Sequence, residues 1–199
     1  MTAQSAKSAS IGAGGFAREK DDFYPTPDWC VEALLWAVDF PGVTWEPACG
    51  DGAILRVFER AGLPVFGSDL IDRGCGVVGV DFLGIAPLRA VRPPDAEHPR
   101  NIVTNPPFKH ASDFAERALD IATGKVAMLV RFNWIAAKSR RKLLTDPRCE
   151  RVLILGRAKM LPPGVEDKGH SPMVDFCWVV WDQEKTDGPV RLEYAKGGA

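Results

Sequence analysis

Two short strings, EPACGDG (Glu46 to Gly52) and NPPF (Asn105 to Phe108), hold the residues best suited to chemistry. Each follows an apolar run that is typical of a strand, and about sixty residues separate them. The first string combines acidic side chains with glycines, and the second offers an amide oxygen, two prolines and an aromatic ring. Because the carboxyl ends of parallel strands meet at one edge of a sheet, we expect both strings at one site.

The first string suits a small ligand that carries positive charge. Gly50 and Gly52 permit a tight turn and leave space beside the backbone, and the helix that follows presents free N–H groups at its start. Glu46 and Asp51 suit a ligand with a sulfonium and an α-amino group. A dinucleotide site would call for GxGxxG instead, so NAD is disfavoured. A strand-to-helix turn without a ligand is the alternative.

Two further acidic residues end the next two predicted strands. Asp69 can accept hydrogen bonds from both hydroxyls of a ribose, as in other nucleotide-binding sheets. Asp81 can accept from an adenine amino group, with Phe82 against the ring. Isolated Asp residues after strands are often turn formers, and Asp72 is close enough to Asp69 to be the ribose ligand in its place.

The NPPF string can activate an amino group on a planar ring. Such an amine is a weak nucleophile because its lone pair is delocalised into the ring, and two acceptors aimed at the NH₂ localise that pair. The Asn105 side-chain oxygen and the Pro106 carbonyl can supply them, Pro107 helps to keep the backbone extended, and Phe108 can stack on the ring. A base within a duplex must first be rotated out. A rigid turn at a strand end is the alternative.

The elements that must position these strings alternate between strand and helix patterns. We expect an α/β, doubly wound fold: a mostly parallel seven-stranded sheet with an antiparallel last strand and helices on both faces. Thr26 or Asp28 can cap the first helix. The strands are expected at 43–45, 64–68, 77–80, 101–104, 126–132, 152–155 and 174–181. The helices are expected from 26 or 28 to 38 and at 52–61, 111–123 and 139–144.

The chain of 199 residues favours one domain. We expect a disordered N-terminal segment (1–20), a single domain (21–183) and a C-terminal tail (184–199), with an exposed loop at 84–99. The Ala/Ser/Gly-rich start includes a GAGG string that follows no strand, so we interpret it as linker. No separate domain for recognising a target is expected.

The formal net charge of −1 gives the whole chain no nucleic-acid signature, but one stretch is basic. Nine Lys or Arg residues lie between Arg131 and Met160, against Asp146 and Glu150. Such an excess can hold phosphates, although a solvated helix face is the alternative. The candidate substrate contacts are Lys109, His110, Arg140, Arg141 and Lys142.

Five scattered cysteines and three isolated histidines show no metal-ligand spacing, so we expect no metal. We interpret the cysteines as reduced thiols. No apolar run reaches the roughly 18 residues of a membrane span, and the N-terminus lacks a signal-peptide pattern. These features favour the cytoplasm and no membrane partner.

Five strings together resemble the DNA N6-adenine methyltransferases, most of all the small orphan enzymes of phages and prophages. They are YPTP (Tyr24 to Pro27), EPACGDG, SDL (Ser68 to Leu70), VDF (Val80 to Phe82) and TNPPF (Thr104 to Phe108). The late stretch GRAKMLPPG…HSPMVDFCWVVW is also similar, so that the resemblance spans roughly residues 22–182. It implies a Rossmann-like class I methyltransferase fold, S-adenosylmethionine as cofactor and DNA as partner.

The resemblance also implies roles for individual residues. The segment 24–27 closes over the methionine end of the cofactor, 46–52 forms the main cofactor loop, Asp69 and Asp81 hold ribose and adenine, and 105–108 binds the target amine. The expected cofactor contacts are Tyr24, Pro25, Thr26, Pro27, Glu46, Pro47, Ala48, Cys49, Gly50, Asp51, Gly52, Asp69, Leu70, Asp81, Phe82 and Asn105. The expected catalytic residues are Asn105, Pro106, Pro107 and Phe108.

The acceptor stays open within this resemblance. Larger members of the family carry a separate target-recognition domain, NPPF also occurs in enzymes that methylate guanine N2 in ribosomal RNA, and NPPY-type relatives modify a glutamine in release factors. Methyl transfer to adenine N6 in DNA is the leading hypothesis. Transfer to RNA (guanine N2 or adenine N6) or to a protein glutamine is the first alternative, and a non-catalytic nucleic-acid-binding relative is the second. The sequence predicts no oligomeric state.

Overall fold

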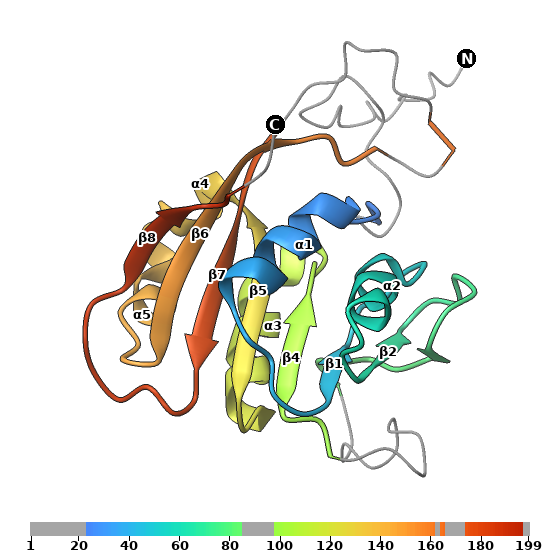
Figure 1. Ribbon diagram of the computed structural model, residues 1–199, viewed down its shortest axis with the longest axis horizontal. Helices are drawn as coiled ribbons and strands as arrows, with labels where there is room; N and C mark the ends of the chain where they lie inside the picture. Colours follow the sequence, from blue (N-terminus) through green and yellow to red (C-terminus); the bar gives the residue numbers. More distant parts are fainter. Residues whose placement is uncertain (1–22, 85–97, 162–163, 166–173, 197–199) are drawn as a thin grey trace, which may run out of the picture.

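A single eight-stranded sheet organises the chain in a computed structural model that describes residues 23–84, 98–161, 164–165 and 174–196 (Figure 1). The strand order is β3-β2-β1-β4-β5-β7-β6-β8. The chain reverses its direction of travel across the sheet between β1 and β4, which neighbour each other in parallel. The strands are β1 (Thr44–Glu46), β2 (Val65–Asp69), β3 (Val77–Val78), β4 (Asn101–Thr104), β5 (Lys125–Arg131), β6 (Cys149–Ala158), β7 (Val174–Asp182) and β8 (Arg191–Tyr194).

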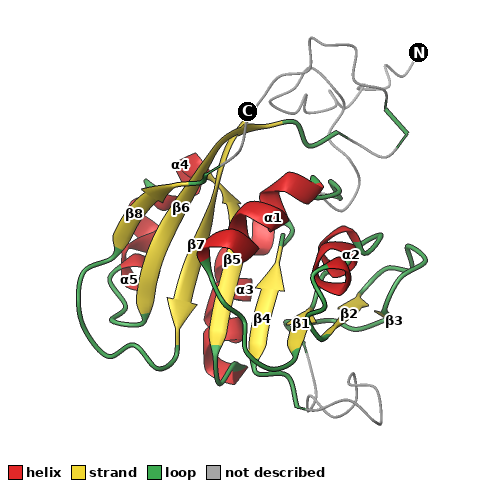
Figure 2. Cartoon of the chain, in the orientation of Figure 1, coloured by secondary structure: helices red, strands yellow, loops and turns green. Residues whose placement is uncertain are grey.

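Helices cover both faces of this sheet (Figure 2). The helices α1 (Asp28–Ala37) and α2 (Ala53–Arg60) pack on one face, and α3 (Ala111–Ile121), α4 (Phe132–Ile135) and α5 (Arg141–Leu144) pack on the other. The expected doubly wound α/β architecture is therefore confirmed.

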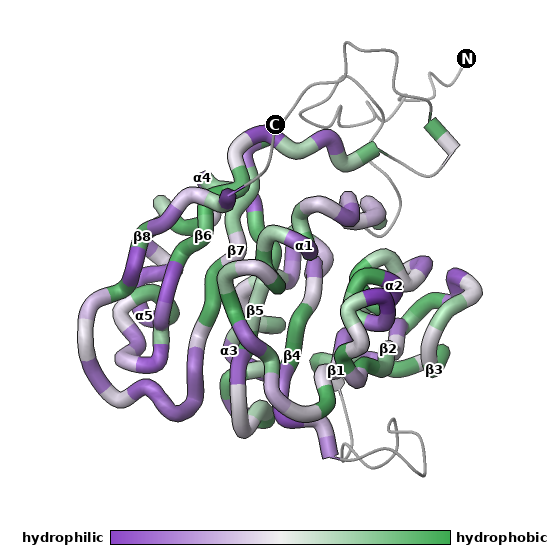
Figure 3. The backbone as a smooth tube through the Cα atoms, in the orientation of Figure 1, coloured by the Kyte–Doolittle hydropathy of each residue, from purple (hydrophilic) through white to green (hydrophobic). Residues whose placement is uncertain are grey.

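The central strand β5 shows why its sequence is apolar throughout. Val126, Met128 and Val130 join the core beneath α3, whereas Ala127 and Leu129 join the core beneath α1. All five are at most 1% exposed. A parallel sheet covered on both faces buries both sides of its strands, and Figure 3 shows this strand as part of the hydrophobic centre of the molecule.

The antiparallel direction predicted for the strand at 174–181 is also confirmed. Strand β7 pairs antiparallel with both β5 and β6. Its tryptophans anchor both helical layers, because Trp178 Nε1 donates to the Cys30 carbonyl of α1 (2.8 Å) and Trp181 Nε1 donates to the Leu143 carbonyl of α5 (2.9 Å).

An eighth strand is absent from the sequence-based prediction. Strand β8 pairs in parallel with β6, outside the seven predicted strands and within the segment expected to be a tail. Its sequence RLEY is short and polar at alternate positions, and Leu192 and Tyr194 are exposed, so it carries no run of buried residues. Arg151 of β6 holds it by donating from Nη1 to a Glu193 oxygen (3.1 Å).

The predicted cap of the first helix is wrong. Pro27 occupies the N-cap position, and no side chain caps the helix. Asp28 instead lies within α1 and pairs with Arg60 of α2 (2.7 Å). The Thr26 hydroxyl accepts a hydrogen bond from a distant side chain described below. The helix expected at 139–144 is split into a 3₁₀ turn, Lys138–Arg140, and α5.

Several expectations lie outside the described residues. They concern the disordered N-terminal segment, most of the loop at 84–99 and most of the loop between β6 and β7. Among the helices that the structure describes, none is long and apolar enough to span a membrane.

Candidate active site

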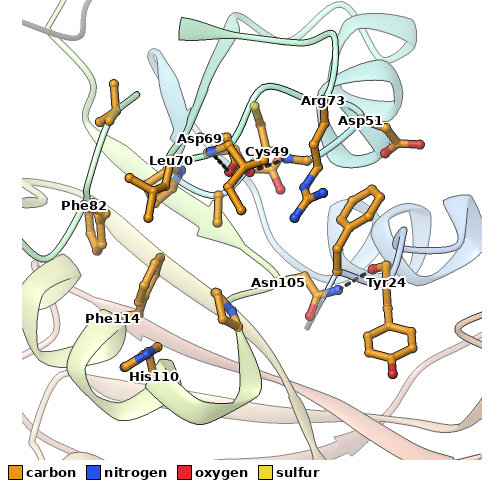
Figure 4. A pocket seen from close by; sticks show the side chains of 18 of the residues that line it. Tyr24, Cys49, Asp51, Asp69, Leu70, Arg73, Phe82, Asn105, His110 and Phe114 are labelled. Carbon is orange, nitrogen blue, oxygen red and sulfur yellow. Dashed lines mark hydrogen bonds between the residues drawn. The ribbon is translucent and has the colours of Figure 1, made fainter. Parts of the chain in front are cut away.

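A cavity of about 640 Å³ opens at the carboxyl edge of the sheet, where β1, β2 and β4 end (Figure 4). Its size is within the range of about 300–1,000 Å³ that is usual for small-molecule sites. The cavity lies at the point where the strand order reverses, as expected for ligand sites of doubly wound sheets. Its walls come from the segment before α1, the β1–α2 turn, the loops after β2 and β3, and the start of the β4–α3 connection.

The glycine turn after β1 forms one wall. Gly50 and Gly52 have φ values of 55° and 81°, which side chains with a Cβ rarely adopt. A Cβ at Gly50 would also lie 2.5 Å from the Phe23 ring. Glycine at this position therefore lets the segment before α1 pack directly on the turn.

Glu46 is the buried acid of the cavity. The residue is 2% exposed, yet it lines the cavity, and its Oε2 is buried without a hydrogen-bond partner among the described residues. Burial, and then the nearby charges of Asp69 and Asp51, raise the pKa of this carboxyl well above its ordinary value. An ionised Glu46 needs a cation next to it, because an unpaired buried charge is costly.

Asp69 is held in place by the backbone. Its two carboxylate oxygens accept from the Gly50 N–H (2.8 Å) and from the Ile71 N–H (2.9 Å). These contacts fasten the loop after β2 to the glycine turn and leave each oxygen able to accept once more. Asp72, the alternative ribose ligand, is exposed, accepts from the Gly74 N–H (2.9 Å) and does not line the cavity.

Asp81 and Phe82 lie at the far end of the cavity, after β3. Asp81 Oδ1 accepts from the Leu83 N–H (3.0 Å), which shapes a turn. The Phe82 ring is 2% exposed and contacts the rings of Trp45 and Phe114 at centroid distances of 5.3 and 4.8 Å. Phe82 therefore presents an apolar wall while it also belongs to the core.

The Asn105 amide is oriented by the segment before α1. Its Nδ2 donates to the Tyr24 carbonyl (3.2 Å) and to Thr26 Oγ1 (3.1 Å). With both donors directed to that side, Oδ1 is left buried and without a hydrogen-bond partner among the described residues. Figure 4 shows Asn105 beside Tyr24 at the cavity. An unsatisfied buried acceptor at a strand end is a place where a ligand N–H can bind.

Phe108 lies outside the cavity lining and is engaged by protein groups. Its ring stacks on Tyr24 (centroids 5.7 Å apart, 23° between planes) and lies 6.3 Å from the Phe176 ring. The guanidinium of Arg131, the last residue of β5, lies over the ring at 4.2 Å from its centroid. In this arrangement Phe108 fixes the 3₁₀ turn after Pro107.

Most of the predicted site residues come together around the cavity. Lining it are Tyr24, Pro25, Thr26, Glu46, Pro47, Ala48, Cys49, Gly50, Asp51, Asp69, Leu70, Asp81, Phe82, Asn105, Pro107, Lys109 and His110. The predicted residues that do not line it are Pro27, Gly52, Pro106, Phe108, Arg140, Arg141 and Lys142. Pro106 and Gly52 are buried in the same two strings.

The basic residues proposed as phosphate contacts lie apart from this cavity. Arg140 packs over the Trp134 ring (5.5 Å) and donates to Ser139 Oγ (2.7 Å). Arg141 and Lys142 are exposed on α5. The structure does not bring these three residues together with the glycine turn and Asn105.

Seven further lining residues are not among the expected contacts, although one of them, Val80, belongs to the VDF string: Phe23, Ala53, Ile71, Arg73, Val80, Leu83 and Phe114. Phe23 directly precedes YPTP, Ile71 directly follows SDL and Arg73 lies two residues further on, so proximity to these strings is the available signal. Side-chain direction in a loop cannot be read from such proximity.

The residues present fit S-adenosylmethionine. Four carboxylates, those of Glu46, Asp51, Asp69 and Asp81, line one cavity, and no group within the described ranges pairs with one oxygen of the buried Glu46. This donor set suits a ligand with a sulfonium, an amino group and ribose hydroxyls.

Comparisons with known proteins support the fold. No family model matches the chain, and no curated protein matches it. Among solved structures, a putative hemolysin from Lactococcus lactis is similar, with a TM-score of 0.57 and 12% identity over 86% of this chain and 93% of that one. A putative class I S-adenosylmethionine-dependent methyltransferase from Listeria monocytogenes has a TM-score of 0.52 and 12% identity over 85% and 63%.

A modification subunit of a putative type I restriction enzyme from Vibrio vulnificus is similar as well, with a TM-score of 0.52 and 16% identity. It matches 84% of this chain, which spans only 45% of the subunit. The chain thus has the Rossmann-like fold of the class I methyltransferases.

Proposed function

We propose that this protein transfers a methyl group from S-adenosylmethionine to the N6 amine of adenine in DNA. The observation that carries the proposal is the Asn105 amide. Its donors are bound to Tyr24 and Thr26, and its buried Oδ1 has no partner among the residues that the structure describes, at the cavity that holds the four carboxylates. An amide fixed in this way can only accept a hydrogen bond at Oδ1, and an exocyclic amine offers the matching N–H.

The chain's own residues then act on the amine. Asn105 Oδ1 accepts one of its hydrogens, the carbonyl of the neighbouring Pro106, a residue that does not itself line the cavity, is assigned the other, and the two acceptors localise the nitrogen lone pair. The two prolines and the Phe108 contacts with Tyr24 and Arg131 hold this turn rigid. The amine proton leaves after transfer, so no side chain has to act as a general base.

The cofactor supplies an electrophilic methyl group on a sulfonium. On this chain Glu46 and Asp51 would face its positive groups, Asp69 its ribose, and Asp81 with Phe82 its adenine. Support comes from the placement of these residues along one cavity, in the order in which β1, β2 and β3 end.

DNA is proposed as the acceptor on two grounds. The strings YPTP, EPACGDG and NPPF occur together in the order of the N6-adenine enzymes, and one structural neighbour is a restriction-modification subunit. RNA, a protein glutamine and binding without catalysis are the competing outcomes of the test below. A cytoplasmic location is part of the proposal and is supported by five free cysteines.

The test is incubation with methyl-labelled S-adenosylmethionine and unmethylated DNA. We expect label in N6-methyladenine after enzymatic digestion of the DNA. Asn105→Ala should lower the transfer rate by about 10²–10³-fold, the usual cost of removing one positioned hydrogen-bonding group from a site. It should leave cofactor affinity within about threefold, since Asn105 is assigned to the amine.

Asn133→Ala is the matched control, because Asn133 is exposed on α4 and does not line the cavity. It should transfer at the wild-type rate. Label that appears on RNA or protein and never on DNA, at any salt concentration, would replace the proposed acceptor. A wild-type protein that binds no S-adenosylmethionine would refute the enzyme altogether.

A further inference from the structure

Arg73 brings a positive charge into a cavity lined by four carboxylates. The residue lies in the loop after β2 and lines the cavity, and Figure 4 shows its side chain pointing inward. Its guanidinium carbon lies 4.2 Å from the centroid of the Phe23 ring. None of the other described residues forms an ion pair with it, although Asp72 is its direct neighbour in the chain.

Phe23 places this guanidinium over the glycine turn. The ring lies where a Cβ of Gly50 would be, within 2.5 Å, so that Arg73, Phe23 and Gly50 form one layered contact. A guanidinium on an aromatic face keeps its N–H groups free at the edge. In this position Arg73 can present a planar pair of donors to a ligand that lies along the turn.

The ligand of the proposed function has one group that needs such a partner. S-adenosylmethionine carries two positive groups, its sulfonium and its α-ammonium, and a single anionic group, the α-carboxylate of its methionine part. Glu46 and Asp51 suit the sulfonium and the amino group at the glycine turn, but they repel the carboxylate beside them. Arginine matches a carboxylate with two parallel hydrogen bonds.

The other cavity cations are less suited to this role. Lys109 and His110 belong to the 3₁₀ turn after NPPF, on the side of the proposed amine, and His110 Nδ1 already lies 3.5 Å from Asp113. Arg56 does not line the cavity, and its Nη2 already contacts the Asp51 carboxylate (3.4 Å).

We infer that Arg73 binds the α-carboxylate of S-adenosylmethionine and that Phe23 positions it. This inference rests on the proposed function. It makes Arg73 the residue that distinguishes the intact cofactor from related sulfonium or thioether nucleosides without a carboxylate. The product S-adenosylhomocysteine keeps the carboxylate and is held in the same way.

The test is calorimetric titration of the full chain with three ligands: S-adenosylmethionine, decarboxylated S-adenosylmethionine and 5′-methylthioadenosine. For Arg73→Gln we expect the affinity for S-adenosylmethionine to fall by about 10–100-fold, as for the loss of a charged hydrogen-bonded pair. The affinities for the two ligands without a carboxylate should change less than about threefold. Arg73→Lys should give an intermediate loss.

Arg60→Gln is the matched control, because Arg60 is an exposed arginine on α2 that pairs with Asp28. It should bind all three ligands as the wild type does. Equal loss for all three ligands in Arg73→Gln would overturn the inference, because the arginine would then only shape the cavity. Unchanged binding of S-adenosylmethionine would overturn it while the proposed function stands. A wild type that binds none of the three would end both.

Discussion

The two ends of the sheet treat their buried polar groups in opposite ways. At the carboxyl end, Glu46 Oε2 and Asn105 Oδ1 are buried and have no partner among the described residues. At the amino end of β5, Lys125 Nζ pairs with Asp182 and with Glu150 (3.5 Å). In the second group the ammonium of Lys125 and the two carboxylates are paired within the protein, although Arg151 Nε beside them has no partner among the described residues. In the first group the open atoms are two acceptor oxygens.

The amino-end cluster extends along the edge of the sheet. Glu150 also accepts from Arg151 (2.8 Å) and from Arg191, and Arg151 reaches Glu193. These contacts join β5, β6, β7 and β8 through side chains that are about 10–50% exposed. Charged groups at the amino end of the sheet thus pair with one another, whereas the carboxyl end leaves acceptor oxygens open where the proposed cofactor and amine would bind.

The largest effect on stability is expected from Lys125→Met. It removes the cation shared by Asp182 and Glu150 and leaves two half-buried carboxylates facing each other. We expect the free energy of unfolding to fall by about 2–3 kcal/mol, less than for a fully buried pair because water still reaches the site. Urea denaturation measures the change. Lys138→Met, at an exposed position, should leave it within about 0.5 kcal/mol, and equal losses for both would contradict the assigned role of the cluster.

Glu46→Gln should raise the free energy of unfolding, whereas Lys125→Met should lower it. The substitution removes a buried carboxyl that has one oxygen without a partner in the described part of the chain, so we expect the unliganded protein to gain about 0.5–2 kcal/mol. The affinity for S-adenosylmethionine should fall by about 10–100-fold, since a neutral amide no longer attracts its cationic groups. Thermal unfolding with and without cofactor measures both effects. Glu59→Gln, exposed on α2, should change neither, and a less stable Glu46→Gln protein would contradict the comparison.

The smallest expected effect is a difference in how stability depends on pH between the carboxylates at the amino end of the sheet and Glu46 at its carboxyl end. Burial raises the pKa of Glu150, but the hydrogen bond from Arg151 and the charges of Lys125 and Arg191 outweigh it, and the pKa is lowered overall. Burial also raises the pKa of Asp182, but the hydrogen bond and charge of Lys125 outweigh it, so that this pKa is lowered overall as well. Stability from lowered carboxyl pKa values is present above the unfolded values of 4.5 and 3.8 and is lost as pH falls through the folded ones.

The pKa of Glu46 shifts in the opposite direction, so its contribution to stability changes with pH in the opposite sense. Because its folded pKa is raised, its contribution is complete below the unfolded value of 4.5 and is lost as pH rises through the folded pKa. Lys125→Met should therefore flatten the decline in stability below about pH 4.5, and Glu46→Gln should flatten the decline above it. Unfolding curves of the unliganded variants between pH 3 and 9 would show this. If both variants altered the decline in stability on the same side of about pH 4.5, the roles assigned to Lys125 and Glu46 would be refuted.

The sequence predicts the sheet well where burial is two-sided or where a turn needs glycine. The runs that became β5 and β7 are apolar because helices cover both faces. The positions of Gly50 and Asn105 follow from strand ends, which parallel pairing brings to one edge. Apolar runs and strand-end residues are local in the sequence, yet they determine which strands are buried and which residues meet at one edge of the sheet.

Other features depend on long-range contacts that no local pattern carries. Strand β8 forms because it pairs with β6 and because Arg151 donates a hydrogen bond to its Glu193. Thr26 is not a helix cap because Asn105, 79 residues away, uses its hydroxyl. Arg73 points inward because Phe23 offers it a ring. In each case the partner is distant in sequence, and only the folded chain reveals it.

The link between Asn105 and the segment before α1 has a consequence for the order of events. Tyr24 and Thr26 border the cavity and also fix the direction of the acceptor oxygen. If this stretch swings aside to admit or release a ligand, the amide loses its orientation in the same movement. Under the proposed function, an open entrance on that side and an oriented acceptor would then exclude each other, so that docking of the segment before α1 and readiness for the second substrate would form a single event.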